Sequence, residues 1–64
     1  MAIVNDYKQL IGKIGVLQSK LNPSGTVLID GEIYDVMTEG EPVDEGRGVK
    51  VTRVQGKKII VRRV

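Results

Sequence analysis

Short stretches in which apolar and polar residues alternate follow one another along most of the 64-residue chain. A strand has a side-chain period of two, so alternation over four to eight residues predicts half-buried β-strands. Turn-forming residues separate these stretches at close spacing, which is typical of small sandwiches and barrels. The expected strands cover residues 13–17, 26–30, 32–36, 49–54 and 57–64.

The strongest local signal is Asp30-Gly31, which stands between two β-rich stretches. A two-residue type I′ loop needs positive φ at both positions, and Asp-Gly is among the pairs that adopt it most readily. Upstream, Asn22-Pro23-Ser24-Gly25 predicts another turn, in which Gly25 takes a positive φ. The Asp30-Gly31 loop sets the register of a hairpin with two distinct faces. One face carries Val27, Ile29, Tyr34 and Val36, and the other carries Leu28 opposite Ile33, with Asp35 and Met37.

A closed barrel suits these strands better than an open sheet, which would expose one apolar face and two unpaired edges. A chain of this length buries only about 60% of its unfolded surface, so the core is thin. Gly15 predicts a close backbone approach, the phase change after Val51 predicts a β-bulge, and Gln55-Gly56 predicts a second hairpin turn. We expect an all-β, five-stranded barrel with Val27, Ile29, Tyr34, Val36, Val49, Val51, Ile59 and Val61 inside, Val43 tucked inward and Ile60 outward.

Residues 1–11 form a separate segment before the barrel of residues 12–64. Apolar residues within 3–11 have the spacing of one helical face, and Gly12 can end such a helix. We expect either a short helix or a frayed leader. A helix this short must dock, and its face can cover a barrel end, cover the hairpin, or contact a partner or membrane surface. That face consists of Ile3, Val4, Tyr7, Leu10 and Ile11.

The composition excludes several kinds of chemistry. Cysteine and histidine are both absent, so the sequence offers no disulfide, no Cys/His zinc site and no Ser-His or Cys-His catalytic pair. The lack of cysteine favours a reducing, cytoplasmic location. No stretch reaches the roughly 20 apolar residues of a membrane span, and no signal-peptide pattern opens the sequence. We expect a soluble protein or the soluble part of a larger one.

No group of residues supports catalysis or cofactor binding. Ser19 and Lys20 are adjacent, and neighbours on a strand point to opposite faces, so a Ser-Lys dyad is not expected. The acidic residues between 30 and 39 do not have the spacing of an EF-hand calcium loop. Lys57 and Lys58 follow a glycine turn but lack the flanking methionine of a biotinyl- or lipoyl-carrier lysine. We expect no enzyme activity, no cofactor, no metal and no small-molecule substrate.

Opposite charges occupy different parts of the sequence. Residues 21–46 contain seven acidic and no basic residues, whereas residues 47–64 contain seven basic and no acidic residues. The basic residues alternate with Val and Ile as in strands, so we expect acidic strands beside basic strands with cross-strand ion pairs. A basic surface for nucleic acid or anionic lipid is the alternative. The only aromatic residues are Tyr7 and Tyr34, both assigned to packing, so stacking with nucleic acid is not favoured.

From about residue 10 to residue 64 the sequence resembles the C-terminal domain of NfeD-like proteins. The family pattern has a Gly-Lys start, the run Leu-x-Pro-Ser-Gly-x-Val-x-Ile-Asp-Gly-x-x-Tyr-Asp, a glycine-containing connection and two final strands. Each turn motif is common alone, whereas their combination is specific. The matching residues are Gly12-Lys13, Leu21, Pro23-Ser24-Gly25, Val27, Ile29-Asp30-Gly31, Tyr34-Asp35, Gly40, Val43, Gly46, Val49, Val51, Gly56, Ile59 and Val61.

This resemblance implies a five-stranded OB-fold-like barrel that serves protein interaction, with a stomatin- or flotillin-like membrane scaffold protein as the partner. In the family this domain usually follows membrane-spanning segments, and longer members carry a serine-protease domain. This sequence matches neither part, so we expect an excised domain or a short member. Membrane contact is then expected only through a partner or through a transmembrane segment outside this sequence. Single-stranded nucleic-acid binding, common among OB-folds, is the alternative function.

The outer face of the Asp30-Gly31 hairpin offers the best candidate contact. Leu28 and Ile33 are expected opposite each other, Met37 is expected nearby, and acidic residues would form a polar rim around them. Single apolar residues in water are normal, whereas a contiguous pair within a polar rim is typical of a small contact patch. We predict that a protein partner binds at Leu28, Ile33 and Met37.

Overall fold

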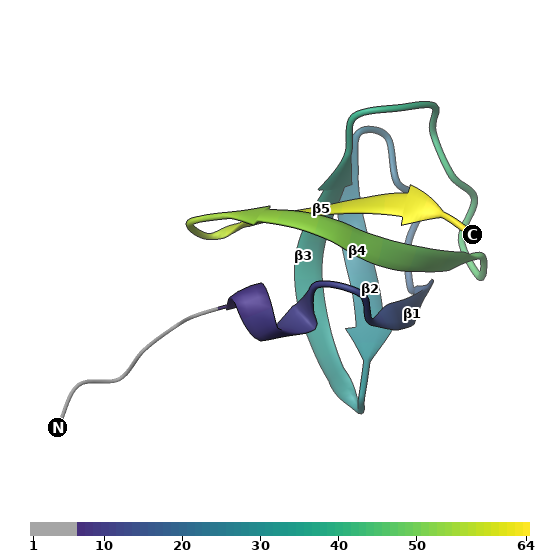
Figure 1. The fold of residues 1–64 in the computed structure, drawn as a ribbon. Helices are drawn as coiled ribbons and strands as arrows, with labels where there is room; N and C mark the ends of the chain where they lie inside the picture. The colour runs from purple at the N-terminus through teal and green to yellow at the C-terminus, as the bar shows by residue number, and fades with distance from the viewer. Residues whose placement is uncertain (1–6) are drawn as a thin grey trace, which may run out of the picture.

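The computed structural model describes residues 7–64, which form five strands around one core with a short helical turn before the first strand (Figure 1). The strand order β1-β2-β3-β5-β4 closes on itself as a barrel, which confirms the predicted fold class. The predicted strands are all present, with ends shifted by at most two residues. The elements are the 3-10 helix η1 (Tyr7–Leu10) and the strands β1 (Ile14–Leu17), β2 (Ser24–Ile29), β3 (Glu32–Thr38), β4 (Gly48–Gln55) and β5 (Lys58–Arg63).

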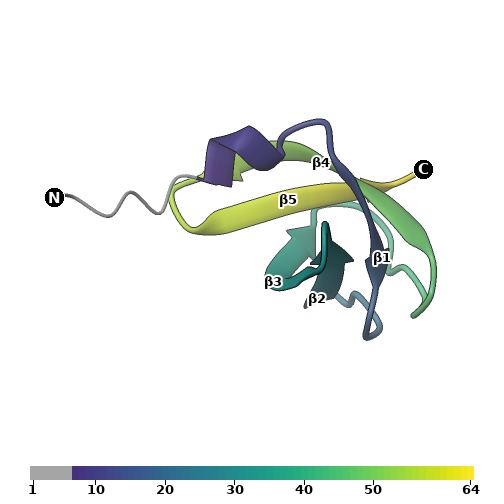
Figure 2. The same cartoon turned by 90° about the horizontal axis from the view of Figure 1, so that it is seen from below.

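Antiparallel pairing joins β1 to β2, β2 to β3, β4 to β5 and β1 to β4, and one parallel pairing between β3 and β5 closes the barrel. This is the arrangement of an OB-fold. Figure 2 shows the result from below, with β2 and β3 on one side of the molecule and β4 and β5 on the other. The two hairpins therefore present separate outer surfaces.

The β2–β3 hairpin has the register that its turn predicts. Leu28 pairs with Ile33, and six residue pairs run in step along the two strands. The φ angles are +51° at Asp30 and +83° at Gly31, the left-handed values that a type I′ turn requires. The predicted β-bulge is also present, as a register shift in β4 between Val51 and Arg53.

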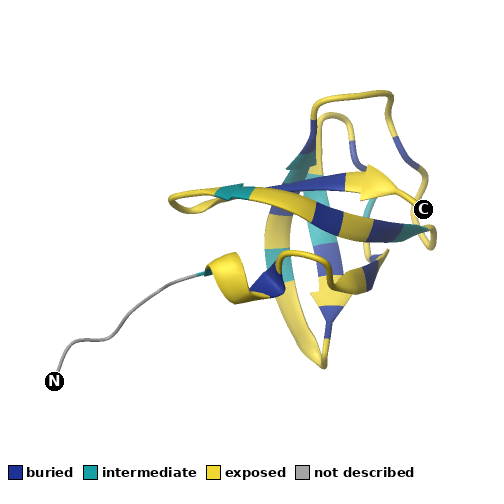
Figure 3. Cartoon of the chain, in the orientation of Figure 1, coloured by how far each residue is buried: buried dark blue, intermediate teal, exposed yellow. Residues whose placement is uncertain are grey.

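Branched aliphatic side chains fill the barrel, and Figure 3 shows buried and exposed residues alternating along the strands. Seven of the eight predicted inner residues are buried, and Tyr34 packs half-buried against the same cluster. Val43 is buried from its loop, as predicted. Three further core residues, Leu10, Leu17 and Leu21, come from η1, β1 and the loop between β1 and β2.

Two positions require glycine because a Cβ atom there would collide with neighbouring atoms, and not because φ is positive. A Cβ at Gly15 would lie 2.5 Å from Ile29 Cγ1 and 2.6 Å from the Leu28 carbonyl oxygen, so β1 lies very close to β2 as predicted. The expectation of a positive φ at Gly25 is wrong. Gly25 belongs to β2, and a Cβ there would lie 2.8 Å from the Lys20 carbonyl oxygen. The peptide bond between Asn22 and Pro23 in this turn is cis.

The described part of the N-terminal segment is one 3-10 turn rather than a longer helix. Leu10 is buried in the core, and the Tyr7 ring meets the Tyr34 ring edge-on at 6.0 Å between centroids. Gly12 follows this turn with φ +91°, as expected for a residue that ends a helix. The turn therefore packs against the barrel core, while the predicted face residues Ile3 and Val4 lie outside the described residues.

Candidate functional site

Three exposed branched side chains form a single row across the outside of β1, β2 and β3. In the strand register Val16 lies opposite Leu28, and Leu28 lies opposite Ile33. Directly opposite residues share one face of a sheet, so the three side chains are neighbours on the outer surface. Their exposed fractions are 46%, 37% and 57%, respectively. We call these three residues the apolar row.

The row is exposed because the alternate residues fill the barrel. Val27 and Ile29 flank Leu28 along β2 and are 0% and 1% exposed, so the period of two turns Leu28 outward. The Asp30-Gly31 turn fixes the register between Leu28 and Ile33. The close approach at Gly15 holds β1 against β2, which completes the row with Val16.

Charged groups border the row. Lys13 Nζ lies 2.7 Å from Asp30 Oδ2 at the turn end, and both side chains are largely exposed. On the opposite face of β3 from Ile33, Tyr34 Oη donates a hydrogen bond of 2.8 Å to Glu32 Oε2. This hydrogen bond to a carboxylate, together with desolvation, raises the pKa of Tyr34 above its ordinary 10.0, so the phenol is neutral at physiological pH. An apolar centre with a polar rim is the usual anatomy of a protein contact.

Met37, the third predicted contact residue, lies apart from Leu28 and Ile33. It pairs with Ser24 on β2 and with Ile60 on β5, near the opposite end of β3, and is half-buried. Ile60 faces outward as expected, but it is only 4% exposed. The register places Met37 and Arg53 on either side of Ile60, so Ile60 is on the outer surface but covered.

The described part of η1 does not cover the apolar row. Leu10 enters the core and Tyr7 packs against Tyr34, while Ile33 is still 57% exposed. Tyr7 thus contacts the hairpin at Tyr34, and the alternative in which the N-terminal face covers Leu28 and Ile33 is wrong for Tyr7 and Leu10. Ile3, the other residue of that alternative, lies outside the described residues.

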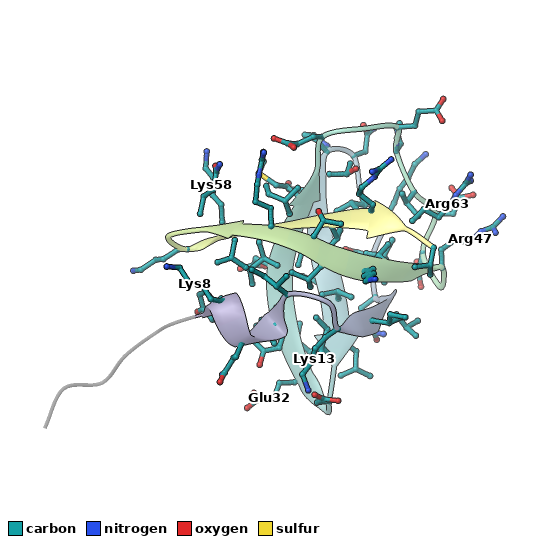
Figure 4. All side chains as sticks on the ribbon, viewed as in Figure 1. Lys8, Lys13, Glu32, Arg47, Lys58 and Arg63 are labelled. Carbon is teal, nitrogen blue, oxygen red and sulfur yellow. The ribbon has the colours of Figure 1, made fainter. Side chains whose placement is uncertain are left out.

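The charge pattern differs from the sequence expectation. The two basic strands β4 and β5 pair with each other, and Lys50 lies directly opposite Arg62. Within residues 7–64 a single ion pair, between Arg53 and Glu39, joins the basic segment to the acidic one. Figure 4 shows Lys58 at the turn end of the β4–β5 hairpin, with Glu32 at the lower tip of the molecule. The acidic strand β3 does lie beside the basic strand β5, as expected, but the predicted set of cross-strand ion pairs is reduced to the one between Arg53 and Glu39.

The candidate catalytic groups have ordinary structural roles. Ser19 Oγ lies 3.1 Å from Thr26 Oγ1 and accepts a hydrogen bond from the Thr26 amide, so it holds the β1–β2 loop to β2. Lys20 is exposed beside it. Residues 7–64 contain no cluster of three acidic, histidine or cysteine side chains suited to a metal ion. They also contain no helix with the length and apolar character of a membrane span.

Residues 7–63 match the model of the "NfeD-like C-terminal, partner-binding domain". The chain belongs to the NfeD family. A curated NfeD relative, the "Membrane protein NfeD1b" of Bacillus subtilis (strain 168), is 46% identical over 55 residues. The match covers 86% of this chain but 13% of that relative, so this chain corresponds to a small part of it.

Two solved structures share the NfeD barrel. The C-terminal domain of a stomatin operon partner protein from Pyrococcus horikoshii has a TM-score of 0.87 at 27% identity, covering 95% of this chain and 97% of that one. The soluble domain of a membrane protein implicated in regulation of membrane protease activity, from Corynebacterium glutamicum, has a TM-score of 0.82 at 26% identity, covering 91% and 97%. An NfeD domain is thus a partner-binding module, and the apolar row is its best-formed exposed apolar feature within residues 7–64.

Sequence reasoning found two of the three residues of the apolar row. It missed Val16 because the strand at residues 13–17 carries no turn motif that links it to β2. A usable signal was present, since Gly15 was expected to mark a close backbone approach. A neighbour that close must be another strand, and alternation then turns Val16 outward.

Proposed function

We propose that this NfeD domain is a non-enzymatic module that binds a stomatin- or flotillin-like protein through the apolar row. The proposal rests on one observation: three exposed branched side chains lie side by side on a chain whose family is partner-binding. The name of the Pyrococcus horikoshii neighbour, a stomatin operon partner, supports this class of partner. Met37 lies on the same outer side of β3 and would contribute only at the margin of the contact.

The size of the row fits a transient complex. Complete burial of a Val, Leu or Ile side chain is worth about 1.5–3 kcal/mol. Because roughly half of each side chain is already covered, a partner that buries all three would gain about 2–4 kcal/mol from them. That gain changes affinity by a large factor but does not make a permanent complex without further contacts.

The proposed setting is a membrane surface on the cytoplasmic side. The names of two relatives, a membrane protein and the soluble domain of a membrane protein, support a position next to a bilayer. The absence of cysteine from the sequence supports a reducing compartment.

Nucleic-acid binding, the alternative function, is less well supported by the surface that OB-folds use for it. That surface is the outside of β2 and β3. Here it carries Leu28 and Ile33 together with the acidic Asp35, and the basic strands lie on the other side of the barrel (Figure 2). Phosphates would meet apolar and negatively charged groups at this face.

The double change Leu28→Ser with Ile33→Thr is expected to lower the affinity for a stomatin-like protein about tenfold or more. Both side chains are on the outer surface, so the thermal midpoint should stay within a few degrees of the unchanged protein. The measurement is a calorimetric titration with the soluble region of a stomatin-like protein, run beside a melting curve.

Ile11→Ser is the matched control, because Ile11 is a branched apolar residue that is 49% exposed and lies in the turn between η1 and β1, next to Gly12, whose amide donates a hydrogen bond to Val51 on β4. It should leave both affinity and midpoint unchanged. A loss of stability with unchanged binding in the Leu28/Ile33 variant would show that the pair is structural and that the partner binds elsewhere.

A further inference from the structure

A second row of exposed residues crosses the barrel on β1, β4 and β5. Ile14 pairs with Lys50, and Lys50 pairs with Arg62, so the three side chains are neighbours on the outer surface. Ile14 is 61% exposed, and both cations are exposed. Val16 lies two residues along β1 on the same outer face and is 46% exposed, so Ile14 extends the apolar surface of β1 up to two paired cations.

The cation pair opposes stability. Like charges directly opposite each other on neighbouring strands repel, and an acidic residue at either position would attract instead. Among residues 7–64 the ion pairs are Lys13 with Asp30 and Arg53 with Glu39, so neither Lys50 nor Arg62 has an acidic partner within 4 Å. The hairpin from residue 48 to residue 63 contains six basic residues and no acidic one. Arg53 has its partner in Glu39, and the charge that would compensate Lys50 and Arg62 is expected on another molecule.

One apolar side chain beside two cations is a combination that complements the surface of an anionic bilayer. An anionic bilayer offers phosphate and carboxylate groups to the cations and an apolar layer just below them for Ile14. Single-stranded nucleic acid also attracts cations, but it binds best where aromatic rings are free to stack. The two tyrosines of this chain pack on each other at 6.0 Å and against the core instead.

We infer that the outer surface of β1, β4 and β5 docks on anionic lipid headgroups, with Lys50 and Arg62 at the phosphates and Ile14 inserted below them. This inference rests on the membrane setting proposed above. The two rows meet on β1, where Ile14 and Val16 share the outer face, and extend from it in opposite directions, the apolar row towards β2 and β3 and the second row towards β4 and β5 (Figure 2). The cations Lys50 and Arg62 are therefore on different strands from Leu28 and Ile33.

The test is co-sedimentation of the 64-residue chain with vesicles at low and physiological salt. We expect binding to vesicles of phosphatidylcholine with 30% phosphatidylserine, weaker binding at higher salt, and little binding to pure phosphatidylcholine. Lys50→Gln and Arg62→Gln should each lower the vesicle partition coefficient about fivefold, the factor that corresponds to one surface cation, and together they should lower it about 25-fold. Ile14→Ser should weaken binding without changing its salt dependence.

Two comparisons separate this role from a general effect of charge or folding. Lys20→Gln removes one exposed cation from the β1–β2 loop and should leave vesicle binding nearly unchanged. Lys50→Gln should also keep or raise the thermal midpoint, because it relieves the repulsion from Arg62. A residue that served only the fold would instead lower the midpoint when replaced.

Three results would overturn the inference: equal binding to neutral and anionic vesicles, unchanged vesicle binding by the Lys50/Arg62 double variant, or single-stranded DNA binding that this variant loses while vesicle binding persists. The proposed partner binding is tested separately, since Leu28→Ser with Ile33→Thr should bind anionic vesicles like the unchanged protein. If vesicle binding fails while the Leu28/Ile33 variant still loses its protein partner, the lipid inference is wrong and the proposed function stands.

Discussion

Val61→Asp is expected to leave the chain unfolded at 25 °C. Val61 is 0% exposed in the centre of β5, opposite Val51 and next to Thr38 of the parallel strand β3. A carboxylate there loses its hydration and gains no partner, which costs several kcal/mol. At the usual stability per residue, a 64-residue domain has a free energy of unfolding of about 3–10 kcal/mol. A cost of several kcal/mol therefore removes most of that free energy.

The control for this change is Val64→Asp, three residues further along the chain, where the side chain is 67% exposed. It introduces the same charge at an exposed site and should remain folded. Circular dichroism and one-dimensional proton NMR would distinguish the two variants. A cooperative melting transition for Val61→Asp close to that of the unchanged protein would mean that the barrel interior is not where the structure places it.

Gly15→Ala is expected to destabilise the fold by about 2–3 kcal/mol, which is large for the addition of one methyl group. The new Cβ would lie 2.5 Å from Ile29 Cγ1 and 2.6 Å from the Leu28 carbonyl oxygen. The oxygen belongs to the β2 backbone and cannot turn aside as a flexible side chain can. Either β1 moves away from β2, or the core around Ile29 repacks.

Gly40→Ala provides the matched comparison, because a Cβ there would meet only Thr38 Oγ1 at 3.8 Å, an ordinary contact. Its free energy of unfolding should stay within about 0.5 kcal/mol of the unchanged value. Urea denaturation of both variants gives the two free energies. Equal free energies would show that β1 has enough space at residue 15, and the predicted contact between β1 and β2 would then be wrong.

The parts of the fold that the sequence predicted well depend on local signals. The Asp30-Gly31 turn determines the register of β2 and β3, and the alternation of Val27 with Leu28 determines which face is buried. Both kinds of information are contained within a few consecutive residues. The same signals are sufficient to place Leu28 opposite Ile33, which is the central pair of the proposed contact.

The errors arise where distant segments meet. Ile60 lies on the outside of the barrel as expected, but the sequence did not show that it is covered there, because the parallel pairing of β3 with β5 brings Met37 beside it. Gly25 was assigned a positive φ from its turn, whereas its role is to make space for the Lys20 carbonyl oxygen. Parallel pairings and loop packing leave no periodic trace in the sequence, so they could not be predicted from it.

The error about charge has a different cause. The signal for a hairpin at Gln55-Gly56 already implies that β4 and β5 pair with each other, and both strands are basic. The expectation of ion pairs between acidic and basic strands did not take this pairing of two basic strands into account. The observed opposition of Lys50 and Arg62 is a consequence of that hairpin together with the bulge between Val51 and Arg53.

The most direct test of the proposed contact is an NMR titration of the ¹⁵N-labelled chain with the soluble region of a stomatin-like protein. The account predicts that the largest shift changes and line broadening occur at the amides of Val16, Leu28 and Ile33 and their strand neighbours. The amide of Arg62, on β5, should change little in the absence of lipid. The largest changes at residues 39–43 or on β4 and β5, with the apolar row unaffected, would contradict the assignment of the row as the partner-binding surface.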